Sequence, residues 1–394
     1  MVELATKSSG EDAGVLRQVA EKLRGGGRLD LQDGVALYDC RELAGLGRLA
    51  EEASLARHGR RVYYGVNRHI NYTNVCRYQC RFCHFCRRVG HAEGYCLTPG
   101  EVAERAAEAA RAGATEVHIV GGVHPELPAG YYVEMLEAVR GACPGLHIKA
   151  FTAVEVLNIA RQARRGVEAT LAWLVEAGLG SLPGGGAEIL EEGYFRRNCP
   201  GKPGPREWLG VHAAAHRLGL MTSATMLHGF DETPAQRVGH LLTLRRLQDE
   251  SLEGGRGHFQ CFVPLPYVPP GSFCGGSAAG AGAAGAESPA AFNAVEDLKT
   301  MAISRLVLDN VPHVKAFWPL LGVNVAQVAL AFGADDLEGT VREYQIATAE
   351  GAAGQEMSIE RIERLIREAR REPVRRGGLV PAGGWSRPGG RGMG

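Results

Sequence analysis

The chain has 394 residues, with 44 basic and 44 acidic side chains and 45% hydrophobic residues. The balanced charge argues against nucleic acid or an anionic membrane as the main partner, and the composition is that of a folded globular protein. No apolar run approaches the roughly 18 to 20 residues that a membrane span requires, and the N-terminal stretch lacks an apolar secretory region. We therefore expect a cytoplasmic protein.

The N-terminal part is expected to be helical up to about His58, after a loose start of some fifteen residues. We assign residues 1–60 to this extension and residues 61–372 to the main domain, which is large enough for a single barrel. Ten cysteines in a chain of this length do not form a disulfide scaffold. Several lie three or four residues apart, as metal ligands do in reducing compartments.

Two stretches hold much of the unusual glycine content, which reaches 54 residues. Residues 271–290 lack large apolar side chains and are interpreted as a low-complexity loop insertion. Residues 373–394 are interpreted as a disordered tail. Its basic side chains are expected to be solvated charges: Arg375, Arg376, Arg387 and Arg391.

Short apolar runs alternate with amphipathic helical patterns between about Val66 and Val341. One helix has a clear start, because Thr98 and Glu101 form a capping box with Pro99 at the first helical position. Other helices are predicted near 131–142, 168–177, 206–218, 234–248 and 291–309. Strands are predicted before the first cysteines and at 115–120, 146–152, 180–183, 221–227, 258–263, 313–317 and near 337. The pattern predicts an α/β fold, a (βα)8 TIM-like barrel with its site at the carboxyl ends of the strands; an open doubly wound sheet is the alternative.

The most informative stretch is a group of four cysteines in NYTNVCRYQCRFCHFCRR. Cys76, Cys80 and Cys83 have the spacing C-x3-C-x2-C, and Cys86 follows after two more residues. Three thiolates on one tight loop can hold three irons of a [4Fe–4S] cluster and leave the fourth iron open to a ligand. A zinc site is the alternative, although a zinc ribbon needs two separated pairs of ligands. Cys86 is interpreted as a spectator thiol, with a saturated cluster as the alternative.

This spacing, with Phe82 directly before the third cysteine, resembles the signature of the radical S-adenosylmethionine (SAM) enzymes. In that family the open iron binds the amino and carboxylate groups of SAM, and reductive cleavage gives a 5′-deoxyadenosyl radical. The resemblance implies a [4Fe–4S] cluster, SAM, and an electron donor such as flavodoxin or ferredoxin. The protein orients the radical and excludes water.

Seven later segments resemble one branch of that family, which contains the two radical enzymes of the futalosine route to menaquinone and the deazaflavin synthase subunits. The similarity is strongest to the aminodeoxyfutalosine synthases. It implies radical addition to 3-[(1-carboxyvinyl)oxy]benzoate, giving 6-amino-6-deoxyfutalosine with SAM as a co-substrate; dehypoxanthine futalosine cyclisation is the alternative. The segments are VHIVGGVHPELP, HIKAFTAVE, GLGSLPGGGAEI, CPGKPGPREWL, ATMLHGFDET, DNVPHVKAFW and FGADDLEGTV.

Five residues are candidates for binding the cofactor, and the first is Phe82 in the cysteine loop. Gly121 and Gly122 follow a predicted strand and let the backbone approach a ligand closely. Glu155 and Glu188 follow the next two strands and resemble family positions that contact the nucleoside. One carboxylate can accept hydrogen bonds from two ribose hydroxyls. The alternative is that each glutamate caps the following helix.

A substrate with two carboxylates needs cations or hydrogen-bond donors in a dry pocket. The candidates are Arg68 and His69, just ahead of the cysteines, and His118 and His124, around the second strand of the barrel. A packing or surface role is the alternative for each histidine. The sequence identifies no catalytic acid or base.

Several positions at the expected substrate end differ from the synthase pattern. Phe230 replaces a histidine, and Val268 lies where the synthases have an F-H-P triplet. Tyr344 and Thr348 stand where paired glutamates and a later histidine are usual. These differences leave the cofactor assignment unchanged and keep the substrate open within the branch.

Overall fold

The computed structural model describes residues 2–269, 293–341 and 356–379, with side chains from residue 10 onward. The predicted insertion at 271–290 lies outside the described residues, as do Tyr344, Thr348, Arg387 and Arg391. Within the described ranges, no helix combines the length and apolar character needed to cross a membrane.

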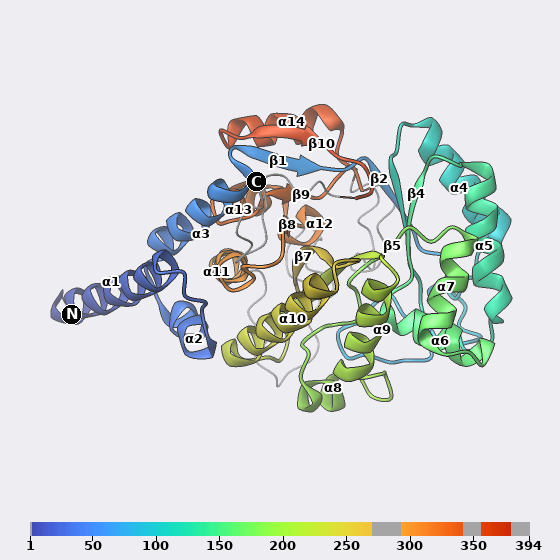
Figure 1. Ribbon diagram of the computed structural model, residues 1–394, viewed down its shortest axis with the longest axis horizontal. Coiled ribbons are helices and arrows are strands. Elements are labelled where there is room, and N and C mark those ends of the chain that lie inside the picture. The colour runs from blue at the N-terminus through green and yellow to red at the C-terminus, as the bar shows by residue number, and fades with distance from the viewer. Residues whose placement is uncertain (1, 270–292, 342–355, 380–394) are drawn as a thin grey trace.

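A curved parallel sheet of ten strands forms the centre of the molecule (Figure 1). Eight strands lie side by side in the order in which they occur along the chain, without the reversal of a doubly wound sheet, so the predicted α/β barrel is confirmed. The eight are β2 (Asn67–Ile70), β3 (Glu116–Ile119), β4 (His147–Ala150), β5 (Ser181–Leu182), β6 (Met221–His228), β7 (Phe259–Pro266), β8 (His313–Ala316) and β9 (Asp336–Leu337). Two strands, β1 (Arg61–Tyr64) and β10 (Glu372–Arg375), extend the sheet beyond β9.

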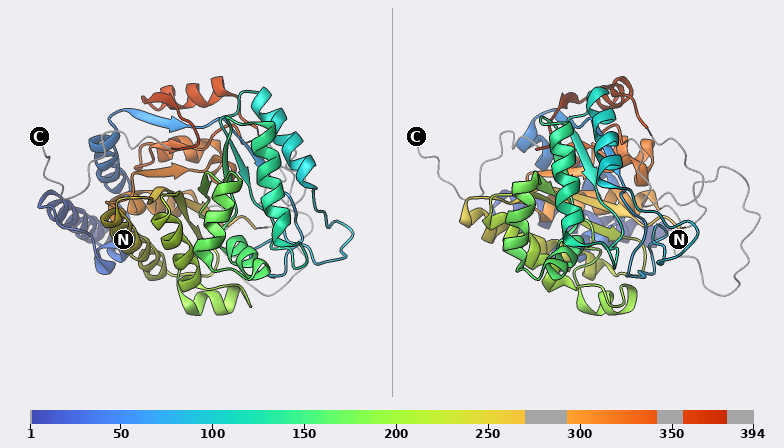
Figure 2. Two further views of the ribbon diagram at one scale, coloured as in Figure 1. Left: turned by 45° about the vertical axis from the view of Figure 1, so that its right-hand side comes forward. Right: turned by 90° about the vertical axis from the view of Figure 1, so that its right-hand side faces the viewer.

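Helices form the outer layer around the sheet (Figure 2). The first of them, α4, begins as predicted: the Thr98 hydroxyl accepts from the Glu101 N–H at 3.2 Å, and the Glu101 carboxylate accepts from the Thr98 N–H at 2.7 Å. The helices after β2 are α4 (Pro99–Arg111), α5 (Ala129–Ala142), α6 (Ala153–Ala163), α7 (Val167–Ala177), α8 (Glu192–Asn198), α9 (Pro205–Arg217), α10 (Pro234–Gly254), α11 (Ala294–Val307), α12 (Trp318–Leu321), α13 (Val323–Ala329) and α14 (Ile359–Glu368).

Side chains, rather than a strand ladder, join the two ends of the eight-stranded series. The Asn67 side chain, at the start of β2, donates to Glu338 at 2.6 Å, and its backbone N–H donates to the Thr340 hydroxyl at 3.1 Å. A Cβ on Gly339 would lie 2.2 Å from the carbonyl oxygen of Gly65. The close approach at this closure therefore requires a glycine.

The N-terminal extension consists of α1 (Val2–Arg24), α2 (Leu31–Asp39) and α3 (Leu43–His58). The expectation of a loose start is wrong, because the first helix begins at Val2 and projects from the barrel (Figure 1). Leu16 and Val19 are buried, so its C-terminal half has an apolar face that packs against α2 and α3. Helix α3 ends where the sequence predicts, at His58.

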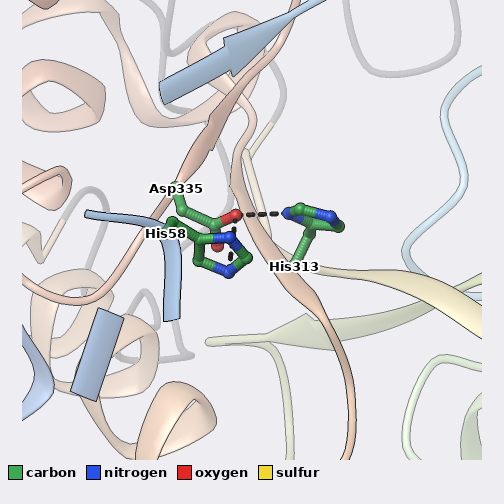
Figure 3. Close-up of side chains that lie close together, drawn as sticks. All are labelled: His58, His313 and Asp335. Atoms are coloured by element: carbon green, nitrogen blue, oxygen red, sulfur yellow. Dashed lines mark hydrogen bonds and ion pairs between the residues drawn. The ribbon is translucent and has the colours of Figure 1, made fainter. Parts of the chain in front are cut away.

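A buried ion-pair network joins the extension to the base of the barrel. One Asp335 oxygen accepts from the Arg305 guanidinium and, at 2.9 Å, from the Val314 N–H. The other pairs with His313 and lies 3.3 Å from Nε2 of His58 (Figure 3). Burial lowers the pKa of His58 to about 4, so this ring is neutral at pH 7. Two histidines and an aspartate are side chains that can bind a metal ion. Arg305 already neutralises the Asp335 carboxylate, so we interpret the cluster as an ion-pair network and not as a metal site.

Residues 372–379 correct two expectations about the C-terminal part. Strand β10 pairs in parallel with β1, so the chain is ordered past residue 373. Arg376 is 4% exposed, and its Nε donates to Asp336 at 2.7 Å. It is therefore not a solvated charge, and the sequence conceals this because its partner lies forty residues away. Arg375 is exposed, as predicted.

We expect Asp335→Asn to lower the free energy of unfolding by about 3 to 5 kcal/mol, because it leaves the buried Arg305 without its counter-charge. Urea unfolding followed by tryptophan fluorescence measures this loss. The control is Glu168→Gln, which removes an exposed ion pair with Arg217 of 2.8 Å and should cost less than about 1 kcal/mol. Equal losses in the two variants would contradict the inference that the buried Arg305 depends on Asp335 as its counter-charge.

Candidate active site

A cavity of about 320 Å³ lies at the carboxyl ends of the barrel strands. All four cysteines of the 76–86 loop line it, together with residues that directly follow β3, β4, β5, β7 and β8. This is the end of the barrel at which the sequence placed the chemistry. The site therefore combines a loop of thiols with a barrel interior.

Backbone hydrogen bonds fix the cysteine loop over the barrel. The Cys76 N–H donates to the carbonyl of Arg87 at 2.9 Å, and the Arg77 N–H donates to that of Val123 at 2.9 Å. The Cys83 N–H donates to the Cys80 carbonyl at 3.1 Å, which curls the loop. Thiolates gathered on one such loop are the donor set of an iron–sulfur cluster. Cys76, Cys80 and Cys83 fit the predicted [4Fe–4S] cluster in chemistry and placement.

Two further thiols lie beside these three. Cys86, a spectator in the prediction, also lines the cavity, and its Sγ donates to the Cys83 carbonyl at 3.5 Å. Cys199, which the sequence reasoning missed, is buried at the C-cap of α8 and acts to raise the pKa of Cys80. Its position in CPGK, within a segment that carries the family resemblance, was the available signal.

Gly121 and Gly122 lie where the sequence placed them, between β3 and the cysteine loop, and both line the cavity. The Gly122 N–H donates to the Thr73 carbonyl at 2.8 Å. A Cβ on Gly122 would lie 2.3 Å from the carbonyl oxygen of Val75 and 3.1 Å from Cβ of Cys76. The glycine therefore allows the backbone of the first cysteine to pack against the end of β3.

Glu155 has a structural role in this geometry. Its carboxylate accepts from the Tyr72 hydroxyl at 2.7 Å, from the Gly121 N–H at 3.1 Å, and from the N–H and hydroxyl of Thr152, each at 2.7 Å. It caps α6, which was the alternative interpretation, and it fixes the backbone of Gly121. Glu155 is not among the residues that line the cavity, so its contact with a nucleoside stays a prediction.

Glu188 lines the cavity, as a residue that contacts a ligand must. Its Oε1 accepts from Nζ of Lys202 at 2.5 Å, and both side chains are more than four-fifths buried. Burial alone would lower the pKa of Lys202, but Glu188 and the neighbouring thiols outweigh it and raise that pKa. The ammonium therefore stays charged beside the cysteine loop. The contact of Glu188 with a nucleoside also stays a prediction.

Aromatic residues lie beside the cysteine loop, and two of them, Phe82 and Tyr267, line the cavity. The ring of Phe82 packs edge-on against Phe230 at 5.7 Å, and Phe230 packs against Tyr267 at 4.8 Å. His84 lies 3.4 Å from the Tyr267 hydroxyl. Phe230 is one of the departures from the synthase pattern, and Tyr267 directly precedes another, Val268. The structure thus brings Phe230 and Tyr267 together with Phe82 beside the cysteine loop.

The four predicted substrate contacts divide into two pairs. His69 and His118 line the cavity, with ring centroids 4.5 Å apart. Burial lowers the pKa of His69 to about 4 and that of His118 well below its usual value, so both are neutral at pH 7. Arg68 points away from the cavity to Glu108 of α4 at 2.8 Å. His124 accepts from the Glu126 N–H at 3.2 Å and is not among the lining residues.

Two buried lysines that the sequence reasoning missed also reach this cavity. Lys149 donates to Glu116 at 2.7 Å, and Lys315 donates to Glu338 at 2.8 Å and lies 3.5 Å from Asp336. Burial alone would lower the pKa of Lys315, but Asp336 and Glu338 raise it above its usual value. Both lysines stand in segments that carried the family resemblance, KAFTAVE and PHVKAFW.

A parallel barrel with a loop of three cysteines at this spacing over the carboxyl ends of its strands defines a radical SAM enzyme. The family model of the Radical SAM superfamily matches residues 70–244, and that of the CofH/MqnC C-terminal region matches residues 287–379. The fold is similar to methylornithine synthase (18% identity, TM-score 0.68, covering 91% of this chain and 97% of that one). It is equally similar to the FeFe-hydrogenase maturase HydG of Carboxydothermus hydrogenoformans (14% identity, TM-score 0.68, covering 94% and 82%).

Sequence relatives narrow the assignment. The chain is 40% identical to the aminodeoxyfutalosine synthase of Streptomyces coelicolor over 93% of both chains, and 36% identical to that of Thermus thermophilus over 92% of this chain and 94% of the relative. It is 39% identical to the 5-amino-6-(D-ribitylamino)uracil–L-tyrosine 4-hydroxyphenyl transferase of Methanopyrus kandleri over 84% and 86%. The chain belongs to the radical SAM superfamily, in the branch that contains these synthases and transferases.

We expect Gly122→Ala to lower the iron and sulfide content after reconstitution, because its Cβ would collide with the backbone beside Cys76. Iron and acid-labile sulfide assays measure the content. Gly130→Ala is the matched control, because a Cβ at that helical position meets no atom within 4 Å. A normal cluster content in Gly122→Ala would show that the loop tolerates displacement from β3.

We expect Cys86→Ala to retain its cluster, whereas Cys83→Ala loses it, because three thiolates leave one iron for an external ligand. Iron content and the electron paramagnetic resonance of the reduced protein measure the outcome, and Cys199→Ala tests the other neighbouring thiol. A loss in Cys86→Ala as large as in Cys83→Ala would indicate four protein ligands and no open iron.

Proposed function

We propose that this protein forms 6-amino-6-deoxyfutalosine from SAM, water and 3-[(1-carboxyvinyl)oxy]benzoate, with release of L-methionine and bicarbonate. The observation that carries the proposal is the identity of 40% with a synthase over 93% of both chains, which takes in the cysteine loop and the cavity walls. A cavity with thiols at its mouth and buried cations at its floor suits an adenosyl donor and an anionic acceptor.

In this proposal Cys76, Cys80 and Cys83 hold the [4Fe–4S] cluster. With SAM bound, that cluster supplies the electron that generates the 5′-deoxyadenosyl radical. Gly121 and Gly122 present their backbone to the cofactor side of the cavity without side chains. Their position supports a contact with the polar end of SAM.

The remaining side chains that line the cavity exclude water from the radical and position the ribose and the substrate. The rings of Phe82 and Tyr267 at the mouth exclude water, which suits a reactive intermediate. Glu188 offers the cavity a carboxylate that Lys202 holds in place, an arrangement that supports contact with ribose hydroxyls. His69 and His118 offer neutral ring nitrogens on the substrate side.

The surface around the cysteine loop supports an electron donor such as flavodoxin or ferredoxin as partner. Arg77, Arg81 and Arg88 are exposed on this loop, although the chain as a whole has no net charge. A local basic surface favours acidic proteins through electrostatic steering. A cytoplasmic location fits the need of such a cluster for a reducing compartment.

Product identification tests the function. Reconstituted protein, SAM, dithionite and the carboxyvinyloxybenzoate, incubated without oxygen, should yield a product with the mass of 6-amino-6-deoxyfutalosine, which is the adenosyl adduct after loss of one carboxylate. Cys83→Ala is the negative control. Free 5′-deoxyadenosine with unchanged benzoate would contradict the proposal.

Parallel incubations distinguish the relatives. Turnover of dehypoxanthine futalosine would assign the cyclase reaction, in which 5′-deoxyadenosine is the co-product. Turnover of L-tyrosine with 5-amino-6-(D-ribitylamino)uracil would assign the transferase reaction named for the Methanopyrus kandleri relative. We expect that neither dehypoxanthine futalosine nor L-tyrosine with 5-amino-6-(D-ribitylamino)uracil is converted at a rate comparable to that of the carboxyvinyloxybenzoate.

A further inference from the structure

A five-residue motif occurs twice in the barrel. HIKAF at residues 147–151 and HVKAF at residues 313–317 differ only by isoleucine and valine. The first spans β4 and the second spans β8, which are the third and seventh of the eight strands that follow one another around the barrel. Strands four places apart in such a barrel lie on opposite walls. The motif therefore presents Lys149 and Lys315 from opposite sides of one cavity.

Each lysine is held by at least one carboxylate. The Lys149 and Lys315 side chains are 7% and 8% exposed. Lys149 pairs with Glu116 at 2.7 Å, whereas Lys315 pairs with Glu338 at 2.8 Å and lies 3.5 Å from Asp336. An ammonium group has three N–H donors. Each lysine therefore keeps at least one N–H for a ligand carboxylate while its protein partners keep it charged and in place.

The region between the lysines is continuous. His69 and His118 lie on β2 and β3, the strands that pass from the β9 side to β4, and both rings line the same cavity as the two lysines. These four side chains consequently share one space at the cavity floor. The apolar wall above Lys315 is formed by residues suited to an aromatic ring: Val263, Leu265, Phe317 and Leu320.

We propose that Lys149 and Lys315 bind the two carboxylates of an aromatic dicarboxylate, one carboxylate at each lysine. The assignment deepens the proposed function and rests on it, since the substrate there carries one carboxylate on its ring and one on its enol ether. The two charge-assisted contacts fix the ring across the cavity. They also select against an amino acid, whose ammonium group would face a lysine.

Three probes test this assignment by isothermal titration calorimetry. They are 3-[(1-carboxyvinyl)oxy]benzoate, the same enol ether without the ring carboxylate, and 3-(vinyloxy)benzoate, which lacks the other carboxylate. Binding is measured with the reconstituted enzyme and SAM but without reductant, so that no turnover occurs. Wild-type protein should bind the dicarboxylate about 10- to 100-fold more tightly than either monocarboxylate, the usual effect of one hydrogen bond to a charged group.

Paired substitutions remove each lysine together with its partner, so that no buried carboxylate is left unpaired. We expect Lys149→Met/Glu116→Gln and Lys315→Met/Glu338→Gln each to weaken dicarboxylate binding about 10- to 100-fold. Each double variant should bind the dicarboxylate no more tightly than one of the two monocarboxylates. The monocarboxylate concerned should differ between the two variants, because each lysine binds a different carboxylate. Lys149→Arg and Lys315→Arg, which keep the charge, should retain most of the discrimination.

Arg68→Met is the matched control, because Arg68 neighbours His69 on β2 but points outward to α4. It should bind all three probes as the wild type does. The assignment is wrong if the double variants bind the dicarboxylate normally, or if they weaken all three probes equally. Should a double variant fail to fold by circular dichroism, equal wild-type affinity for the three probes would still overturn it.

The two proposals fail separately. Tight, lysine-dependent binding of the dicarboxylate without adduct formation on reduction would reject the proposed reaction and keep the lysine assignment. Adduct formation with affinities that do not depend on Lys149 or Lys315 would reject the assignment and keep the reaction.

Discussion

The close packing of the cysteine loop against the backbone that follows β3 is the contact on which the site depends. Gly122 donates to Thr73 at 2.8 Å, and its Cα faces the carbonyl of Val75, where a side chain would not fit. Glu155 holds the preceding Gly121 from below while it caps α6. Through this contact the thiols, the glycine backbone and the barrel interior share one cavity.

The barrel interior is charged yet locally neutral. Its buried cations each meet a carboxylate: Lys149 with Glu116, Lys315 with Glu338, and Arg376 with Asp336. A buried ion that loses its partner is costly, whereas a complete pair is close to neutral in stability. Such pairs therefore contribute little to the net stability of the fold. They keep the cationic groups charged inside a cavity that holds little water. That property suits the capture of anions.

The charges are arranged in levels along the barrel axis. At the base, Asp335 collects Arg305, His313 and His58 and thereby attaches the N-terminal extension. At the closure, Asn67 bonds to Glu338 and replaces a missing strand ladder. The same Glu338 receives Lys315 from the cavity floor. The barrel closure and the proposed ligand contact therefore share one carboxylate.

The sequence by itself determined the features that depend on local spacing. The alternation of apolar runs and helices defines the parallel barrel, and the capping box at Thr98 defines the start of α4. The spacing of Cys76, Cys80 and Cys83 predicts the cluster chemistry. These signals lie within a few residues or repeat with a fixed period, so no knowledge of the fold is required. The same pattern places Gly121 and Gly122 shortly after the end of β3.

Only the tertiary structure decided which way each side chain faces and what lies opposite it. Arg68 and His69 are neighbours in the sequence, but successive residues of a strand point to opposite faces, so one contacts α4 and the other lines the cavity. Lys149 and Lys315 are 166 positions apart and line the same cavity only because the sheet curves around. Arg376 looks like a solvated charge until β10 brings it to Asp336. Pairing across the barrel depends on closure, which no local pattern encodes.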